Sequence, residues 1–260
     1  MTSEESNSST RFAEGRSFSR RIGRVVACSL IILLASCGGR DASTGKNQST
    51  EANVVAPETP APLQPAGKTF EYNFDTDVTD QMPARFHGAL TGQGAKADWV
   101  VKQDEAAPSG QNVLAQISTD RTDYRFPLAI ADDGSFRDLE LSTKFKAVSG
   151  QIDRAAGLVF RLKDANNYYI VRANALENNY RLYRVLNGRR EQIAGSNVSV
   201  SSGEWHELAV VCSGNSITCY FDGEKKIEAS DDTFTDAGKI GLWTKADSVT
   251  FFDDLKVTAR

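Results

Sequence analysis

The sequence has few of the side chains on which metal binding and acid–base catalysis most often depend. Its 260 residues include only 2 His and 4 Cys. A metal centre built from several His is therefore excluded, and a Ser-His-Asp triad would have to use one of two His. No Gly-x-Ser-x-Gly motif is present. Positive charge is also scarce, since 30 Lys and Arg stand against 34 Asp and Glu and give a net charge of −4. Without a basic excess, we expect no binding to nucleic acid.

Long apolar runs are missing as well. The uncharged run Val25–Ser36 is too short for a membrane-spanning helix, which needs about 20 residues. Several Arg precede it, and this basic-then-apolar order is typical of an export signal. The run leads into Leu34-Ala35-Ser36-Cys37, which resembles the bacterial lipobox, where cleavage before Cys frees an amine and the thiol takes a diacylglycerol. We therefore predict a signal peptide over 1–36 and lipidation of Cys37.

The residues after Cys37 indicate to which membrane the protein is sorted and where its folded domain begins. Gly38 and Gly39 follow rather than Asp. By resemblance to the enterobacterial sorting pattern, this favours the outer membrane of a bacterial cell envelope. The segment 37–67 then has no aromatic residue and holds four of the 7 Pro, so it cannot bury enough apolar surface to offset its ordering entropy. We predict a lipid-anchored flexible tether over 37–67 and one domain over 68–260.

From residue 68 on, apolar residues recur with the period of 2 that is typical of β-strands. No stretch of ten residues has a convincing helical stripe, and turn signals such as Asn187-Gly188 and Asp222-Gly223 separate the runs. Many short strands at regular spacing predict an all-β fold, an antiparallel β-sandwich. The expected strands are 70–74, 139–147, 157–162, 168–174, 180–185, 206–212, 217–221, 239–243 and 249–257.

The segment 157–174 is predicted to be a hairpin whose two faces differ. If 164–167 is a four-residue loop, Val159 lies opposite Arg172 and Arg161 opposite Ile170. One face is then almost wholly apolar and is expected to be core. It carries Leu158, Phe160, Leu162, Tyr169, Val171 and Ala173. The other face is mixed, and carries Val159, Arg161, Tyr168, Ile170, Arg172 and Asn174.

The mixed face is either solvated sheet surface or a ligand-binding face. Arg and Asn side chains can bond vicinal hydroxyl groups, and flat aromatic rings stack on the C–H faces of sugars. This chemistry favours carbohydrate as the partner. The ligand-binding candidates are Arg161, Tyr168, Arg172, Asn174, Tyr183 and Trp243.

Taken together, the strands resemble the concanavalin A-like lectin/glucanase superfamily, of laminin-G-like jelly-roll type. Within it they look most like the bacterial 3-keto-disaccharide hydrolase domain family. The segments that carry this resemblance are 136–141, 156–161, 167–172, 203–208, 238–243 and 252–255. The resemblance implies a jelly-roll fold over nearly all of 68–260. It also implies hydrolysis or lysis of keto-sugar glycosides as one activity.

Two departures favour binding over catalysis. Members of the hydrolase family usually carry an Asn-Ser-Gly stretch where this chain reads Gly150–Ala156. A glucanase of the superfamily needs three alternating carboxylates on one strand, but the position after Asp138 and Glu140 on their face is Ser142. No catalytic residue is therefore assigned. The leading hypothesis is a lipid-anchored carbohydrate-binding module, with a keto-sugar hydrolase or lyase and a protein-interaction module as alternatives.

Two smaller questions remain open at this stage. Asp75, Asp253 and Asp254 lie near the two ends of the domain. There they are either solvated turn residues or ligands of a structural Ca²⁺ that ties neighbouring terminal strands. Cys212 and Cys219 flank the turn Gly214-Asn215, and pairing Cys212 with Ile217 makes a disulfide to Cys219 awkward. They are either bridged or free buried thiols.

We expect Cys37 to be the mature N-terminus and to carry diacylglycerol. Mass spectrometry of the membrane-extracted protein should find this modification. The Cys37→Ala protein should no longer partition into membranes, and its retention there would contradict the prediction.

Overall fold

The computed structural model describes residues 62–260, so the predictions for 1–36 and for Cys37 lie outside the described residues. Residues 62–260 contain no helix, and hence none that could cross a membrane. They form fifteen strands. These are β1 (Thr69–Tyr72), β2 (Phe86–Gly92), β3 (Trp99–Gln103), β4 (Asn112–Gln116), β5 (Arg125–Ala131), β6 (Leu139–Ser149), β7 (Ala155–Asp164), β8 (Asn167–Asn174), β9 (Asn179–Leu186), β10 (Arg189–Asn197), β11 (Trp205–Ser213), β12 (Ser216–Phe221), β13 (Glu224–Ser230), β14 (Lys239–Trp243) and β15 (Val249–Ala259).

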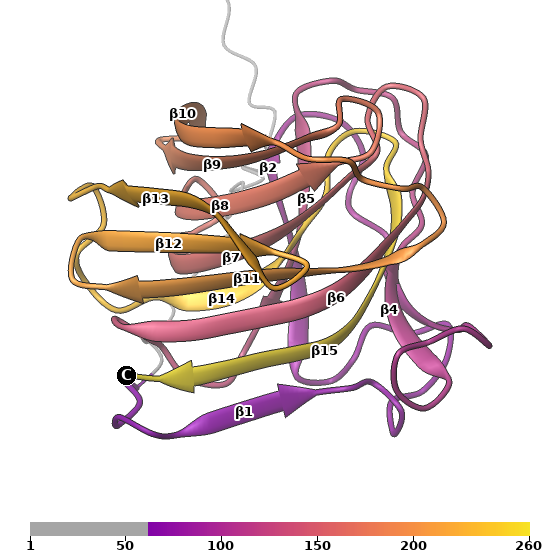
Figure 1. Cartoon of the computed structure of the whole chain (residues 1–260). Coiled ribbons are helices and arrows are strands. Elements are labelled where there is room, and N and C mark those ends of the chain that lie inside the picture. Colours follow the sequence, from indigo (N-terminus) through magenta and orange to yellow (C-terminus); the bar gives the residue numbers. More distant parts are fainter. Residues whose placement is uncertain (1–61) are drawn as a thin grey trace, which may run out of the picture. The chain divides into compact units, whose positions relative to one another are not determined.

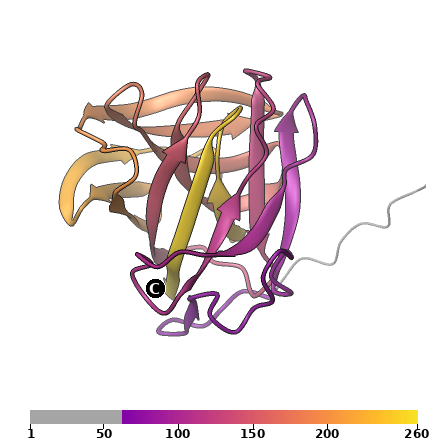
Figure 2. The same ribbon diagram turned by 90° about the vertical axis from the view of Figure 1, so that its right-hand side faces the viewer.

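The strands form two antiparallel sheets, as the sequence pattern predicts. One has eight strands in the order β13-β12-β11-β6-β15-β4-β3, with β1 paired to β15. The other has seven, in the order β10-β9-β8-β7-β14-β5-β2. Figure 1 shows β13, β12, β11, β6, β15 and β1 one below the other, and Figure 2 shows the sheets turned by 90°. The fold is a jelly-roll-type β-sandwich.

The main core lies between the sheets and follows from alternation along the strands. In β6, for example, every second residue from Leu139 to Ala147 is buried, because successive side chains point to opposite faces. Aromatic rings supply much of the core volume. Its largest fully buried members are Phe74, Phe136, Phe145, Phe160, Tyr169, Tyr180 and Phe252. Cys212 and Cys219 belong to the same core as free thiols, and Cys212 pairs with Ile217 as expected.

The hairpin of β7 and β8 confirms the predicted core face but not the predicted register. Val159 pairs with Ile170, whereas Arg172 pairs with Gly157. The connection is a tight turn between Asp164 and Asn167, and a β-bulge follows Phe160. At this bulge Arg161 adopts a left-handed backbone, with φ at 47°. The bulge exchanges the faces of the next residues, so Leu162 leaves the inter-sheet core.

The domain begins earlier than predicted. Leu63 forms a bridge with Ser135, and the N–H of Gly67 donates to the carbonyl oxygen of Ala259 at 2.8 Å. The predicted tether over 37–67 is therefore wrong at its C-terminal end. Backbone pairing fixes these residues although they lack the aromatic side chains that mark the rest of the domain.

We expect Phe160→Ala to lower the free energy of unfolding by about 3–5 kcal/mol, through lost transfer energy and the cavity left behind. Phe160 is fully buried and stacks on Tyr169 with ring centroids 5.4 Å apart. Equilibrium unfolding in urea would measure the loss, with the exposed Val148 changed to Ala as a control. Equal, small effects at both positions would show that Phe160 does not lie in the core.

Candidate functional site

The outer face of the seven-stranded sheet gathers five of the six predicted ligand-binding residues. Tyr168, Tyr183 and Trp243 belong to a second apolar cluster on that face. Arg172 bonds to the hydroxyl of Tyr183, and Asn174 lies two residues further along β8. All five are at most 7% exposed. They are therefore buried, whereas the sequence predicts either a solvated sheet surface or a ligand-binding face.

Arg161 does not join this face. The bulge turns its guanidinium towards the other sheet, where it is fully buried. It donates to the carbonyl oxygens of Arg137, Phe234 and Gly214 at 2.7, 2.8 and 2.6 Å. It also bonds to the carboxylate of Asp138 at 3.2 Å. Arg161 therefore does not share a face with Arg172 as the sequence predicts, and its hydrogen bonds tie loops together.

Arg172, on β8, is held by groups on β9 and on the turn between the two strands. Its guanidinium donates to Asn179 Oδ1 at 2.6 Å, to Glu177 Oε2 at 2.8 Å and to the Tyr183 hydroxyl at 3.2 Å. Burial raises the pKa of Glu177, but the hydrogen bond from Asn179 and the charge of Arg172 outweigh it, so the pKa of Glu177 is lowered. The carboxylate stays ionised and keeps the pair intact.

Asn174 belongs to an adjoining buried network. Its Nδ2 donates to Asp153 Oδ1 at 2.7 Å, and Lys245 Nζ lies 3.0 Å from Asp153 Oδ2. Burial raises the pKa of Asp153, while the charge of Lys245 opposes the shift. The Asn174 amide, which the sequence suggests as a ligand-binding group, is thus hydrogen-bonded within the protein.

Arg190 closes the aromatic part of this face, and the sequence analysis missed it. From β10 its guanidinium carbon lies 4.8 Å from the ring centroid of Phe126, 4.6 Å from that of Tyr183 and 5.7 Å from that of Trp243. A cation over aromatic faces is stabilised by the ring quadrupoles. The Tyr124 hydroxyl accepts from the Arg190 N–H at 3.2 Å and donates to Gly188 O at 2.8 Å. These contacts hold the β9–β10 hairpin over the rings.

An open cavity of about 650 Å³ lies at the margin of the same sheet, on β2, β5, β7 and β14. Apolar side chains contribute part of its lining, namely Ala89, Ile130 and Leu162. The rest is largely polar and charged, and includes His87, Lys163, Asp164, Asp236 and Lys239. Its size lies within the range of small-molecule sites.

The charged groups of this cavity are fixed by short contacts. His87 Nδ1 bonds to Asp132 Oδ1 at 2.6 Å, and Lys239 Nζ lies 3.5 Å from the same oxygen. Across the cavity, Lys163 Nζ donates to Asp236 Oδ2 at 2.8 Å. None of these residues was selected from the sequence. His87 and Asp132 lie on or next to β2 and β5, which were not recognised as strands, and Lys163 and Lys239 lie at or next to the ends of predicted strands.

The hydrogen bonds of Asp75 and Asp253 favour the reading of these residues as turn carboxylates over that of a structural Ca²⁺ site. Asp75 Oδ1 accepts the N–H groups of Gln111 and Asn112, and Asp253 Oδ2 accepts the N–H and hydroxyl of Ser109. These donors occupy carboxylate lone pairs that Ca²⁺ would require. Within residues 62–260, no group of three His, Cys, Asp or Glu side chains could hold a metal ion.

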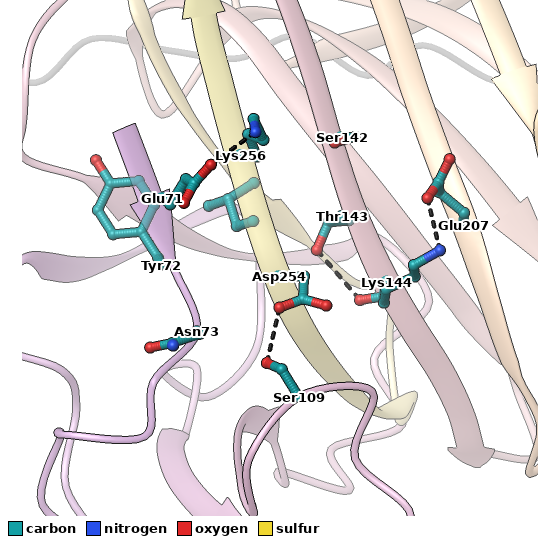
Figure 3. A pocket seen from close by; sticks show the side chains of 11 residues that line it. Glu71, Tyr72, Asn73, Ser109, Ser142, Thr143, Lys144, Glu207, Asp254 and Lys256 are labelled. Atoms are coloured by element: carbon teal, nitrogen blue, oxygen red, sulfur yellow. Dashed lines mark hydrogen bonds and ion pairs between the residues drawn. The ribbon is translucent and has the colours of Figure 1, made fainter. Parts of the chain in front are cut away.

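Asp253 and Asp254 nevertheless differ in their surroundings. Asp253 is fully buried, and this burial raises its pKa to about 6, with the charge of Asp254 adding to the shift. Asp254 lines a second cavity, of about 580 Å³, on the outer face of the eight-stranded sheet, and the Ser109 hydroxyl donates to it at 2.7 Å (Figure 3).

The sequence of residues 92–258 matches the 3-keto-alpha-glucoside-1,2-lyase-like domain. The chain belongs to this family. The match confirms the resemblance seen in the strand motifs and covers most of the lyase-like domain described above. A comparison with curated proteins gave no match.

Solved structures show the fold of this lyase-like domain in other proteins. The carbohydrate-binding module CBM66 from Bacillus subtilis superposes with a TM-score of 0.53 at 18% identity, over 66% of this chain and 95% of that one. A β-glucanase from Bacillus licheniformis superposes with a TM-score of 0.51 at 15% identity, over 75% and 99%. At such identities these similarities establish the concanavalin A-like fold alone.

We expect Arg172→Ala to lower the free energy of unfolding by about 1–3 kcal/mol, because Tyr183 and Asn179 lose a buried donor. Thermal or urea unfolding would measure this. Arg260→Ala is a matched control, since its half-exposed side chain pairs with Glu140 at the surface and should contribute less than about 1 kcal/mol. A loss no larger than that of Arg260→Ala would show that the Arg172 network is not structural.

Proposed function

We propose that this domain binds carbohydrate in the cavity at the margin of the seven-stranded sheet. The observation that carries the proposal is its lining, in which Ala89, Ile130 and Leu162 are accompanied by charged groups. Sugars present apolar C–H faces together with hydroxyl groups, so a pocket with both kinds of surface complements them. Family membership and the concanavalin A-like fold support the same ligand class.

The proposal includes the cellular location that the N-terminal sequence predicts. A diacylglycerol on Cys37 would anchor the domain at the bacterial cell envelope, with the outer membrane as the favoured site. The Pro-containing segment that follows would let the domain reach polysaccharide away from the bilayer surface. Support for this part comes from the sequence alone.

Lysis of keto-sugar glycosides is a second candidate function, favoured by His87 and Asp132. In a 1,2-elimination from a 3-keto glycoside, a base removes the C2 proton, which the ketone makes acidic. The bond from C1 to the glycosidic oxygen then breaks, and the leaving oxygen takes up a proton. His87 bonded through Nδ1 to Asp132 has the arrangement of a general base, and Lys239 can stabilise an enolate oxygen. His87 lies before the matched residues 92–258, so the family match itself does not assign this role.

We expect calorimetric titration with a broad oligosaccharide panel that includes 3-keto-disaccharides to detect binding. Ala89→Trp should weaken it at least tenfold, because the ring fills the cavity from a half-buried position on the edge strand β2. Lys225→Ala, on β13 of the other sheet, is the control and should bind normally.

Two outcomes would contradict binding in this cavity. One is a folded wild-type protein that binds no glycan, and the other is an Ala89→Trp protein that binds as the wild type does. Product release from a 3-keto-disaccharide that disappears in His87→Gln would instead establish the lyase.

A further inference from the structure

The cavity on the outer face of the eight-stranded sheet is separate from the proposed carbohydrate pocket. It lies where β1 ends beside β15, and β6 and β11 complete its lining (Figure 3). Its volume of about 580 Å³ is large enough for a small ligand. Polar groups dominate it, including Asn73, Ser109 and Ser142.

Four of the five charged side chains around the cavity are already paired. Glu71 Oε1 lies 2.6 Å from Lys256 Nζ, and Glu207 Oε2 lies 2.6 Å from Lys144 Nζ. The fifth, Asp254, accepts a hydrogen bond from the Ser109 hydroxyl and has no ion-pair partner among the described residues. Three carboxylates and two ammonium groups give the cavity a net charge of −1. One further positively charged hydrogen-bond donor would neutralise it.

The backbone presents Asp254 to this cavity. Between Asp253 and Lys256 the register of β15 on β6 shifts at a β-bulge, and Asp254 takes a left-handed conformation with φ at 48°. A bulge of this kind re-aims a side chain. Figure 3 shows the Asp254 carboxylate between Ser109 on one side and Lys144 on the other.

An adjoining hollow extends the cavity along the same sheet face. It measures about 530 Å³, shares Lys144 and Glu207 with the first cavity, and includes the partly exposed Trp205. An indole ring is a stacking surface for a sugar. The two hollows together offer room for more than one sugar unit.

We propose that this cavity binds an oligosaccharide of amino sugars with free ammonium groups. One ammonium group pairs with Asp254, hydroxyl groups bond to Asn73 and Ser142, and a neighbouring ring stacks on Trp205. The attraction arises because Asp254 is the one acid of the cavity that no described basic side chain neutralises. Because the site lies on the opposite sheet, the proposal is independent of binding at the other cavity.

Calorimetric titration with a glucosamine oligosaccharide tests this proposal, and the N-acetylated oligosaccharide of equal length is the matched ligand control. We expect the free amine form to bind at least tenfold more tightly, and Asp254→Asn to remove that preference. Asn accepts the left-handed backbone and can still accept the Ser109 hydrogen bond, so the variant should fold. Glu228→Gln alters an exposed, paired acid on β13 and should bind normally.

The possible outcomes distinguish amino-sugar binding at this site from a metal site here and from binding in the other cavity. Equal affinity for both oligosaccharides, or unchanged binding by Asp254→Asn with normal thermal unfolding, would overturn the proposal. Calcium alone raising the melting temperature in wild type but not in Asp254→Asn would overturn it in favour of a metal site. Loss of amine binding in Ala89→Trp but not in Asp254→Asn would assign the ligand to the other cavity.

Discussion

The central strands of the seven-stranded sheet are buried on both faces, and much of the structure follows from this constraint. In β8, all residues from Tyr168 to Asn174 are buried, whereas a sheet of a simple sandwich buries one face. The outer face therefore needs a cover, and the side chain of Arg190, from the edge strand β10 of the same sheet, supplies part of it by lying over the aromatic rings. An open cavity lies beyond this cover, on β2, β5, β7 and β14.

Two-sided burial also explains how this protein accommodates buried charge. Arg161, Arg125 and Arg172 are each at most 4% exposed. The guanidinium of Arg161 donates mainly to backbone carbonyl oxygens of loops, as that of Arg125 does to Ala95, Lys96 and Ala246. A planar group with five donors can satisfy several such oxygens at once. Arg161 and Arg125 therefore join segments that are distant in sequence, whereas Arg172 ties β8 to the neighbouring turn and to β9.

The sequence predicts the strands that alternate strictly or are apolar on both faces, and these carry the fold. It fails at strands whose pattern is weak. β5 contains Pro127, and β10 and β13 are polar edge strands, so alternation does not mark them. The register of β7 on β8 could not be predicted either, because the bulge at Arg161 depends on carbonyl groups of Arg137, Phe234 and Gly214 that are remote in sequence. An error of two residues preserved the core face but misplaced the arginine.

The two open cavities differ in how their charges are balanced, and this difference separates their expected ligands. At the margin of the seven-stranded sheet, Asp132 bonds to His87 and lies near Lys239, while Asp236 bonds to Lys163. Among the described residues, Asp164, which also lines this cavity, accepts hydrogen bonds only from the Asn166 N–H and from Asn167 Nδ2. The two Lys and two Asp that line the cavity nevertheless balance in charge. In the proposed binding mode, selectivity there comes from shape and hydroxyl bonding. On the other sheet, Asp254 has only the hydroxyl of Ser109. Since an unpaired carboxylate attracts a cation more strongly than a neutral hydroxyl, charge dominates recognition there. The two proposals thus assign ligands of different charge to two polar hollows on opposite sheets of one β-sandwich.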